Sequence, residues 1–190
     1  MALAPVRTVA PSSTPVSLVE AKAHLRVDHT DEDTLITGLI ASATDHLDGW
    51  AGILGRAIIT QTWRQDFDCF PAKLRLPLHP VASVSGVTYY DGDNVSQTLS
   101  TDVYELLKDD GGAYVARKAD QTWPGTKNRA AAVSVTFVAG EAAAPAAIEA
   151  AILLMVGHWY ENREAVSEGS FTAVPMSVDA LLAPYRRVGV

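Results

Sequence analysis

The sequence has little of several things that define common protein classes. It contains one cysteine, Cys69, in 190 residues, which excludes an internal disulfide framework and a four-cysteine zinc site. Lys and Arg number only 15 against 22 Asp and Glu, so the net charge of −7 excludes a broad basic surface for gripping DNA or RNA. Hydrophobic residues nevertheless make up 48% of the chain and charged residues 19%, which excludes a wholly disordered protein.

Long hydrophobic runs are also missing. The most apolar stretch, residues 142–157, is interrupted by Pro145 and Glu149. It is shorter than the roughly 20 residues that a membrane-spanning helix needs. The first fifteen residues lack the apolar run of a signal peptide. We therefore expect a protein with no membrane partner.

Apolar residues at three- and four-residue steps predict helices in two parts of the chain. The predicted helices cover residues 17–26, 31–54 and 145–163. Ser17 with Glu20, and Thr30 with Asp33, have the spacing of capping boxes at the first two helix starts. Pro145 suits the first turn of the third helix, where its missing N–H leaves no bond unmade.

The middle of the chain changes to a period of two. Residues 59–67 alternate as a half-buried strand does, and residues 133–138 do so again. Two hairpins are expected around the turns Asp91-Gly92 and Asp109–Gly112. Short strands joined by local turns favour antiparallel pairing. The predicted fold class is α+β: a helical body with an antiparallel β-rich insertion at about 58–139 and an extended C-terminal arm.

The expected domain organisation has three parts. Residues 1–16 are rich in Pro, Ser and Thr and are predicted to be a flexible N-terminal segment. Residues 17–165 are predicted to form a single domain, and residues 166–190 an arm with a short helix. The arm carries an apolar patch followed by two arginines. It could dock on a partner or fold back on its own domain, and the sequence leaves both open.

No set of side chains makes a convincing reaction centre. Four possible metal ligands lie close together in sequence: His24, Asp28, His29 and Asp31. They straddle a predicted helix break and lack the i, i+4 histidine pair of a zinc protease helix. Capping and surface solvation explain them better, so no metal site is predicted.

Two further candidates also favour structural roles. His158 and Glu161 share a predicted helix face, but di-metal carboxylate bundles need this motif twice, and a hydrogen bond within the helix or between subunits is favoured. Cys69 has no basic cluster or helix start beside it to stabilise a thiolate, so we expect it to be buried. No catalytic residue and no cofactor is predicted.

Several segments together resemble a known family. They are residues 17–28, 31–36, 61–64, 76–81, 84–91, 135–140, 151–166 and 181–186. The most specific is 151–166, AILLMVGHWYENREAV. These segments resemble the head–tail connector (adaptor) proteins of long-tailed phages and of phage-like gene transfer agents. The resemblance covers nearly the whole chain after residue 16.

The resemblance implies a structural virion protein and no enzymatic activity. Members of this family form a ring of about twelve copies under the portal, in the virion neck. DNA passes through the ring without sequence-specific binding. One face meets the portal protein, often through C-terminal arms, and the other meets a stopper or tail-terminator protein. An acidic subunit suits such a channel, which we expect to be neutral or acidic, because many Lys and Arg contacts would hold the DNA.

This interpretation gives two sets of candidate interface residues. The tethered apolar patch and its arginines are predicted to bind the portal: Val178, Leu181, Leu182, Tyr185, Arg186 and Arg187. The polar end of the third helix is predicted to lie between subunits: Glu161, Arg163 and Glu164.

Two other functions stay open. One is a stopper or tail-terminator ring protein of the same neck region, which binding to purified portal would distinguish. The other is a small metal-dependent hydrolase that uses His24, Asp28, His29 or His158. The lack of a complete set of nucleophile, base and orienting group disfavours it.

Overall fold

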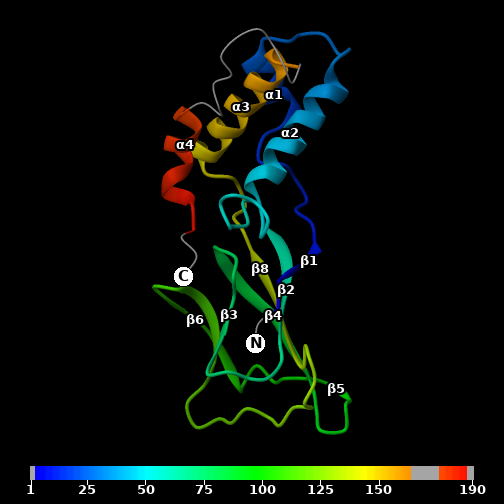
Figure 1. Ribbon diagram of the computed structural model, residues 1–190, viewed down its shortest axis with the longest axis vertical. Helices are drawn as coiled ribbons and strands as arrows, with labels where there is room; N and C mark the ends of the chain where they lie inside the picture. The colour runs from blue at the N-terminus through cyan, green and yellow to red at the C-terminus, as the bar shows by residue number, and fades with distance from the viewer. Residues whose placement is uncertain (1–2, 164–175, 188–190) are drawn as a thin grey trace. The chain divides into compact units, whose positions relative to one another are not determined.

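The computed structural model describes residues 3–163 and 176–187. The chain forms two compact units (Figure 1). Of the described residues, the helical unit comprises 13–59, 142–163 and 176–187, and the sheet unit comprises 3–12 and 60–141. Helices and antiparallel sheets are both present, as the predicted α+β class requires. Within the described residues, no helix is long and apolar enough to cross a membrane.

Helix α1, Leu18–Leu25, begins with the predicted capping box. The Ser17 hydroxyl accepts a hydrogen bond from the Glu20 backbone N–H at 3.2 Å, and the Glu20 carboxylate accepts one from the Ser17 N–H at 2.8 Å. Two backbone donors at the helix start are thereby satisfied. The helix ends at Arg26, whose φ of 58° places it in the left-handed region.

Helix α2, Asp33–Leu47, ends earlier than the predicted residue 54. The chain leaves the helix at Asp48, whose carboxylate accepts a hydrogen bond from the Ile58 N–H at 2.7 Å. Leu54 continues the helical pattern in sequence but is buried within the irregular segment that follows the helix. The second predicted capping box is also wrong, because Glu32 occupies the N-cap and makes no side-chain capping bond.

The other helices complete the helical unit. Helix α3 is Ala146–Glu161, α4 is Met176–Leu182, and the 3-10 turn η1 is Ala183–Tyr185. Helix α3 packs against α1, α2 and α4. Its central position follows from its composition, since it is apolar almost all the way round. The fully buried side chains of this core come from all four helices and the segment after α2, and include Ala21, Ile36, Leu47, Leu54, Ile152 and Leu182.

The sheet unit holds two antiparallel sheets. The larger has five strands in the order β1-β2-β8-β4-β5, formed by Val6–Val9, Gln61–Phe67, Val133–Ala139, Val81–Tyr90 and Ser96–Thr98. The smaller has the order β3-β7-β6, formed by Lys73–Arg75, Gly112–Arg117 and Tyr104–Asp109. The two predicted hairpins are confirmed as β4–β5 and β6–β7.

Strand β1 corrects the prediction for the N-terminus. Residues 1–16 are predicted to lack fixed structure, yet Val6–Val9 pairs with β2 as an edge strand. All four of its residues are exposed, so the sequence carries no burial pattern to reveal the strand. Backbone hydrogen bonds to β2 hold it instead.

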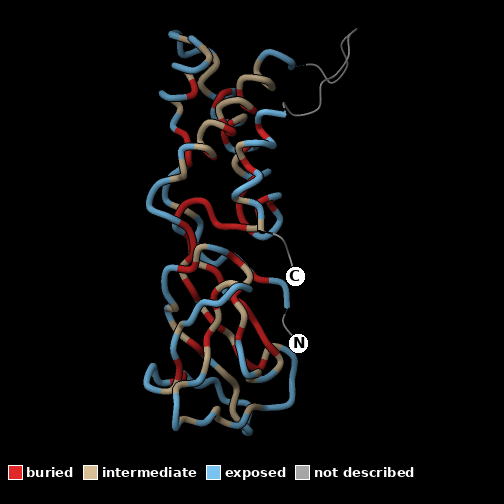
Figure 2. Tube along the Cα trace, turned by 90° about the vertical axis from the view of Figure 1, so that its left-hand side faces the viewer, coloured by how far each residue is buried: buried red, intermediate tan, exposed pale blue. Residues whose placement is uncertain are grey.

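Alternation along the strands gives each sheet a buried side. Along β8, Val133, Val135, Phe137 and Ala139 are buried while the residues between them are half-buried. Along β7, Ala113 and Val115 are buried in the same way. Figure 2 shows buried stretches of the trace alternating with half-buried and exposed ones in the sheet unit. Cys69, predicted to be buried, is exposed in the loop after β2. The next residue, Phe70, stacks its ring on that of Trp123, with 4.7 Å between the ring centroids.

Candidate interaction surfaces

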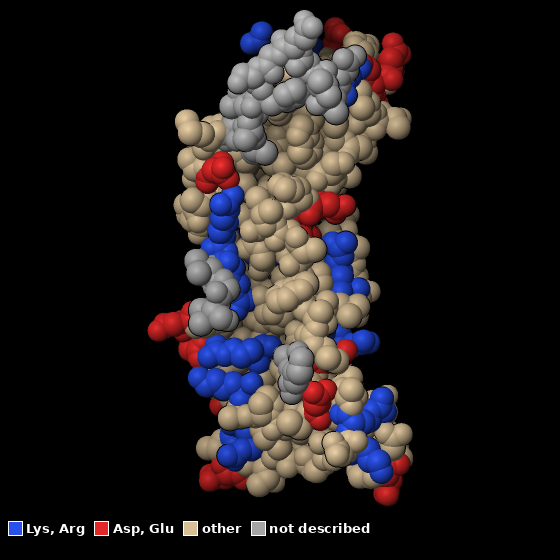
Figure 3. Space-filling view, in the orientation of Figure 1, with Lys and Arg blue, Asp and Glu red and all other residues tan. Residues whose placement is uncertain are grey.

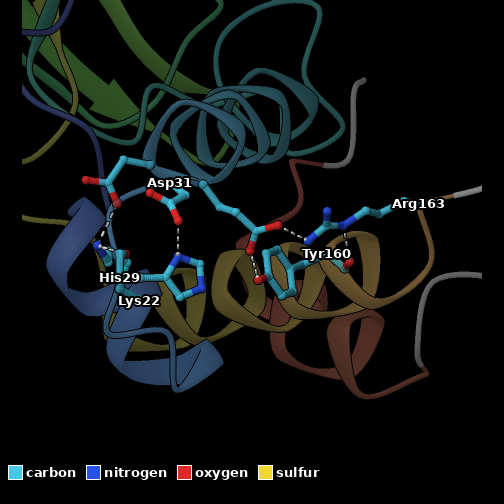
Figure 4. A network of polar contacts seen from close by, with 7 residues as sticks. Lys22, His29, Asp31, Tyr160 and Arg163 are labelled. Carbon is cyan, nitrogen blue, oxygen red and sulfur yellow. Dashed lines mark hydrogen bonds and ion pairs between the residues drawn. The ribbon is translucent and has the colours of Figure 1, made fainter.

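A polar cluster joins α2 to the end of α3 (Figure 4). The Glu32 carboxylate accepts hydrogen bonds from the Tyr160 hydroxyl and from the Arg163 guanidinium, the latter at 2.6 Å. The Arg163 Nε also donates to the Tyr160 carbonyl at 3.2 Å, and the guanidinium lies 4.6 Å from the centre of the Tyr160 ring. The Glu32 carboxylate, at the start of α2, therefore bonds both Tyr160 in the last turn of α3 and Arg163 just after that helix.

These contacts shift the ionisation of all three groups. The Tyr160 hydrogen bond, assisted by Arg163, holds the pKa of Glu32 below its ordinary value. The same hydrogen bond to Glu32 raises the pKa of Tyr160, and the bond to Glu32 raises the pKa of Arg163. Each group is thus held in the protonation state it has at neutral pH. The cluster acts as a fixed structural link, not as an exchanger of protons.

The first metal candidate proves to be two separate contacts. Lys22 donates to the Asp33 carboxylate at 2.6 Å and to the His29 carbonyl at 2.7 Å. His29 lies 4.0 Å from the Asp31 carboxylate. His24 instead faces Gly157 of α3, where an added Cβ would be 3.3 Å from the histidine ring. Across residues 3–163 and 176–187, no three His, Cys, Asp or Glu side chains come together to hold a metal.

The residues predicted to lie between subunits have different surroundings. Arg163 is bonded to Glu32 of its own chain. Glu161 is exposed at the last position of α3, and Glu164 falls outside the described residues. His158 accepts the Asn162 backbone N–H at its carbonyl, at 3.1 Å, and its ring lies 3.4 Å from the Asn162 amide. This agrees with a hydrogen-bonding role within the helix. The assignment of Glu161, Arg163 and Glu164 to a subunit boundary stays a prediction.

The C-terminal segment lies on its own helical unit, one of the two arrangements that the sequence left open. Val178 and Leu182 of α4 are fully buried in the helical core. The Arg187 N–H donates to the Leu54 carbonyl at 3.0 Å, and the Arg56 guanidinium lies 5.3 Å from the centre of the Tyr185 ring. The segment after α2 therefore holds the end of the C-terminal segment in place.

Two of the six predicted portal-binding residues, Val178 and Leu182, thus serve the protein's own core. Leu181 and Tyr185 are half-buried, and Arg186 is exposed and paired with Asp179 at 2.5 Å. An open depression of about 330 Å³ lies beside them. It is lined by His46, Ile53, Met155, Val178, Asp179, Leu182 and Arg186.

The sheet unit has a charged cluster of its own. Asp109 of β6 makes a two-pronged contact with the Arg75 guanidinium, one prong at 2.7 Å, and pairs with Lys73 at 2.9 Å. Both cations lie within 5.0 Å of the centre of the Tyr114 ring. Hydrogen bonds from Arg75 first, and then from Lys73, lower the pKa of Asp109. The cluster links strands β3, β7 and β6 across the small sheet.

Neither cluster could be found from local spacing. Glu32 and Arg163 are 131 residues apart, and Arg75 and Asp109 are 34 apart. On the face drawn in Figure 3, basic side chains lie in several groups with acidic side chains beside them, and large uncharged areas lie between the groups.

Comparison with known proteins supplies the remaining evidence. Residues 15–78, about a third of the chain, match the family described as "Phage gp6-like head-tail connector protein". Residues 15–78 carry the sequence signature of phage head–tail connectors. The predicted resemblance to these connectors is thereby confirmed. The matched residues include α1, α2 and strands β2 and β3. No protein with curated function matches the sequence.

Solved structures extend the likeness to almost the whole chain. A chain from a structure described as "Virion of native gene transfer agent (GTA) particle" has 22% identity and a TM-score of 0.78. A chain from "Neck of empty GTA particle computed with C6 symmetry" has the same identity and a TM-score of 0.77, and one from "Neck of native GTA particle computed with C12 symmetry" scores 0.69. Each match covers 99% of this chain and 97% of the other. The connector-like chain therefore shares the fold of these particle proteins.

Proposed function

We propose that this protein is a structural head–tail connector in the neck of a phage or a phage-derived particle. It forms a ring of about twelve copies under the portal, links the capsid to the tail, and lets DNA pass through its lumen. It performs no catalysis.

The observation that carries this proposal is agreement over the full length of the chain. The connector signature covers residues 15–78, and the fold matches chains of gene transfer agent particles over 99% of the sequence. Two of those structures were computed with sixfold and twelvefold symmetry, which supports an assembly of about twelve copies.

The physical chemistry of the chain fits a ring around DNA. In a head-to-tail ring each subunit uses two different patches, so one modest contact is repeated until the assembly closes. The net charge of −7 disfavours a tight grip on phosphate groups. We expect the lumen to be neutral or acidic. Several rings of Lys or Arg lining the channel of the assembled particle would contradict this expectation.

The portal-facing surface is proposed to involve the C-terminal segment. With Val178 and Leu182 packed in the core, the surface proposed for a partner is formed by Leu181, Tyr185 and Arg186, with the half-buried Arg187 beside them. The adjoining 330 Å³ depression offers an apolar recess beside them. Helix α4 would then present this surface without leaving its own unit.

The boundary between subunits is proposed to include Glu161, Arg163 and Glu164. Arg163 is exposed enough, at 49% of its side chain, to meet a neighbour while it bonds to Glu32. If Arg163→Ala leaves ring assembly and its salt sensitivity unchanged, this part of the proposal is wrong.

The deciding experiment is cryo-electron microscopy of particle necks combined with binding to purified portal. We expect density for this chain directly under the portal, and direct binding of the isolated protein to portal. Binding to tail components but not to portal would indicate a stopper or tail terminator instead. Stoichiometric metal in the purified protein, measured by elemental analysis, would revive the hydrolase hypothesis.

A further inference from the structure

The five-stranded sheet has one side that faces away from the interior of the sheet unit. The strand register assigns its residues. Across strands β1, β2, β8 and β4, one row is Val9, Thr62, Val138 and Ser83, and the next is Val6, Arg64, Thr136 and Gly86. A third row is Asp66, Ser134, Thr88 and Thr98, across β2, β8, β4 and β5. We call these twelve residues the outer face.

The outer face is almost free of charge. Arg64 and Asp66 are its only charged residues, and they pair with each other at 3.0 Å. The rest are Thr, Ser, Val and Gly. The corresponding side of the small sheet carries Lys73, Arg75, Glu105 and Asp109, as is usual for a sheet surface in contact with water. Depletion of charged residues is the compositional mark of the core of a protein–protein interface.

Most of the outer face is also open, although Asp66, in its third row, is buried. A Cβ added at Gly86, in the second row, would meet no atom within 4 Å. At the β1 edge Val6 and Val9 are 47% and 57% exposed. Thr136 and Val138, in the middle strand, are only half-buried. A sheet surface that exposes valine and hydroxyl groups but few charges is suited to contact with another protein surface.

We propose that the outer face binds a neighbouring copy of the same chain. This inference rests on the proposed ring, and it names the surface through which the ring closes. The distribution of charge identifies the occupant. Among the described residues, the sheet unit holds nine Lys and Arg against ten Asp and Glu, whereas the helical unit holds six against ten. A contact made mainly by the nearly neutral sheet units keeps like-charge repulsion between copies small, and a local contact around Arg163 of the helical unit can accompany it.

Nucleic acid does not suit this surface. Its single cation, Arg64, is neutralised by Asp66, so the outer face has no free positive charge for phosphate groups. When two copies meet through their sheet units, both contacting surfaces are nearly neutral. The hydroxyl groups of the outer face can form hydrogen bonds at that contact, so their desolvation costs little.

Site-specific crosslinking in assembled particles tests the proposal directly. Because Cys69 is the only cysteine, a Cys69→Ser chain with Thr136→Cys carries a single thiol on the outer face. Labelled with benzophenone maleimide and irradiated within purified particles, it should yield a crosslinked product of twice the chain mass that contains peptides of this chain alone. A crosslink to a different virion protein, or no crosslink, overturns the proposal.

Failure of the proposed function would look different. The chain would then be missing from the particles altogether, before any crosslinking result is read. The same label at Thr101, an exposed turn residue outside the sheet, provides the matched control position and should give markedly less self-crosslinking.

A charge placed on the outer face gives an independent test. Thr136→Glu should lower incorporation into particle necks by about tenfold or more, because a carboxylate would be buried without a partner. Gly86→Glu, at the paired position with open space around its Cβ, should do the same. Thr101→Glu is the control and should be incorporated normally. If both outer-face variants melt like the original protein and still assemble normally, the outer face is not the contact.

Discussion

The two units of this protein differ in net charge and in how they bury their apolar residues. The helical unit is acidic, with six basic against ten acidic residues in its described part, and surrounds one apolar core to which all four helices contribute. The sheet unit is nearly neutral, with nine against ten, and buries residues by strand alternation. The acidic unit suits the proposed passage of DNA without a tight grip, and the nearly neutral unit suits the proposed contact between copies.

Each unit is built from segments that are not consecutive in the chain. Residues 60–141 form most of the sheet unit and are inserted between α2 and α3. The N-terminal residues Val6–Val9 then add an edge strand to that inserted sheet. The helical unit is therefore interrupted by its insertion, while the sheet unit needs a strand from outside it. The units are compact separately but cannot be separated by one cut in the chain.

The largest effect is expected from Phe137→Ala in the sheet unit. Phe137 is fully buried on the middle strand β8, so truncation should cost about 3–5 kcal/mol of unfolding free energy. Calorimetry measures the loss. If the two units unfold separately, only the transition of the sheet unit should move. Equal shifts of both transitions would show that the two units unfold together and are not stabilised separately.

Leu182→Ala is the matching test in the helical unit. Leu182 is fully buried in α4, and its truncation should cost about 2–5 kcal/mol. Leu181→Ala, at a half-buried position next to it, is the matched control and should cost clearly less. Equal small losses would mean that α4 is not packed on the helical unit in solution. The same result would restore the idea of a free C-terminal arm.

The contrast between units also explains what could be predicted from sequence. The Ser17 capping box and the period-two strands were predictable because their signals are local. The end of α2 was not, because Leu54 keeps the helical spacing while Asp48 turns the chain away to bond Ile58. Strand β1 was missed because its four exposed residues have no alternation and depend on β2 for their pairing.

The interaction surfaces were less predictable than the fold. The sequence predicted an interface role for Arg163, which stays a prediction, but could not show Glu32, its partner 131 residues away. The apolar patch Val178, Leu181 and Leu182 was visible, but which of these residues the core would bury depends on packing that only the structure defines. The outer face requires the register of five strands, so no single segment of the sequence contains it.

A smaller effect is expected from Ser17→Ala at the start of α1. The substitution removes the hydroxyl that accepts the Glu20 N–H, and loss of such a cap costs about 1 kcal/mol. The melting transition of the helical unit should fall accordingly, and that of the sheet unit should stay fixed. Ser17→Asp, which retains a capping oxygen, is the control and should melt close to the original protein. A melting temperature unchanged by Ser17→Ala would show that the cap contributes nothing.

The smallest effect concerns acid, and it separates the two charged clusters. Both Glu32 and Asp109 have a pKa below the ordinary values of 4.5 and 3.8, because hydrogen bonds stabilise their ionised forms: from the Tyr160 hydroxyl and then Arg163 for Glu32, and from Arg75 and then Lys73 for Asp109. Each therefore stabilises the folded state above its ordinary pKa, and this contribution is lost as the pH falls through the lowered value. Asp109 faces two cations, Arg75 and Lys73, so its ion pairs should persist to lower pH than the contacts of Glu32.

We expect carbon-13 chemical shifts of the carboxyl groups to show Glu32 becoming protonated before Asp109 as the pH falls. Glu32→Gln should weaken the acid dependence of the helical unit alone, and Asp109→Asn that of the sheet unit alone. Both effects should be modest and should shrink in high salt, because the pairs are partly exposed. Protonation in the reverse order would show that the second cation does not strengthen the link in the sheet unit.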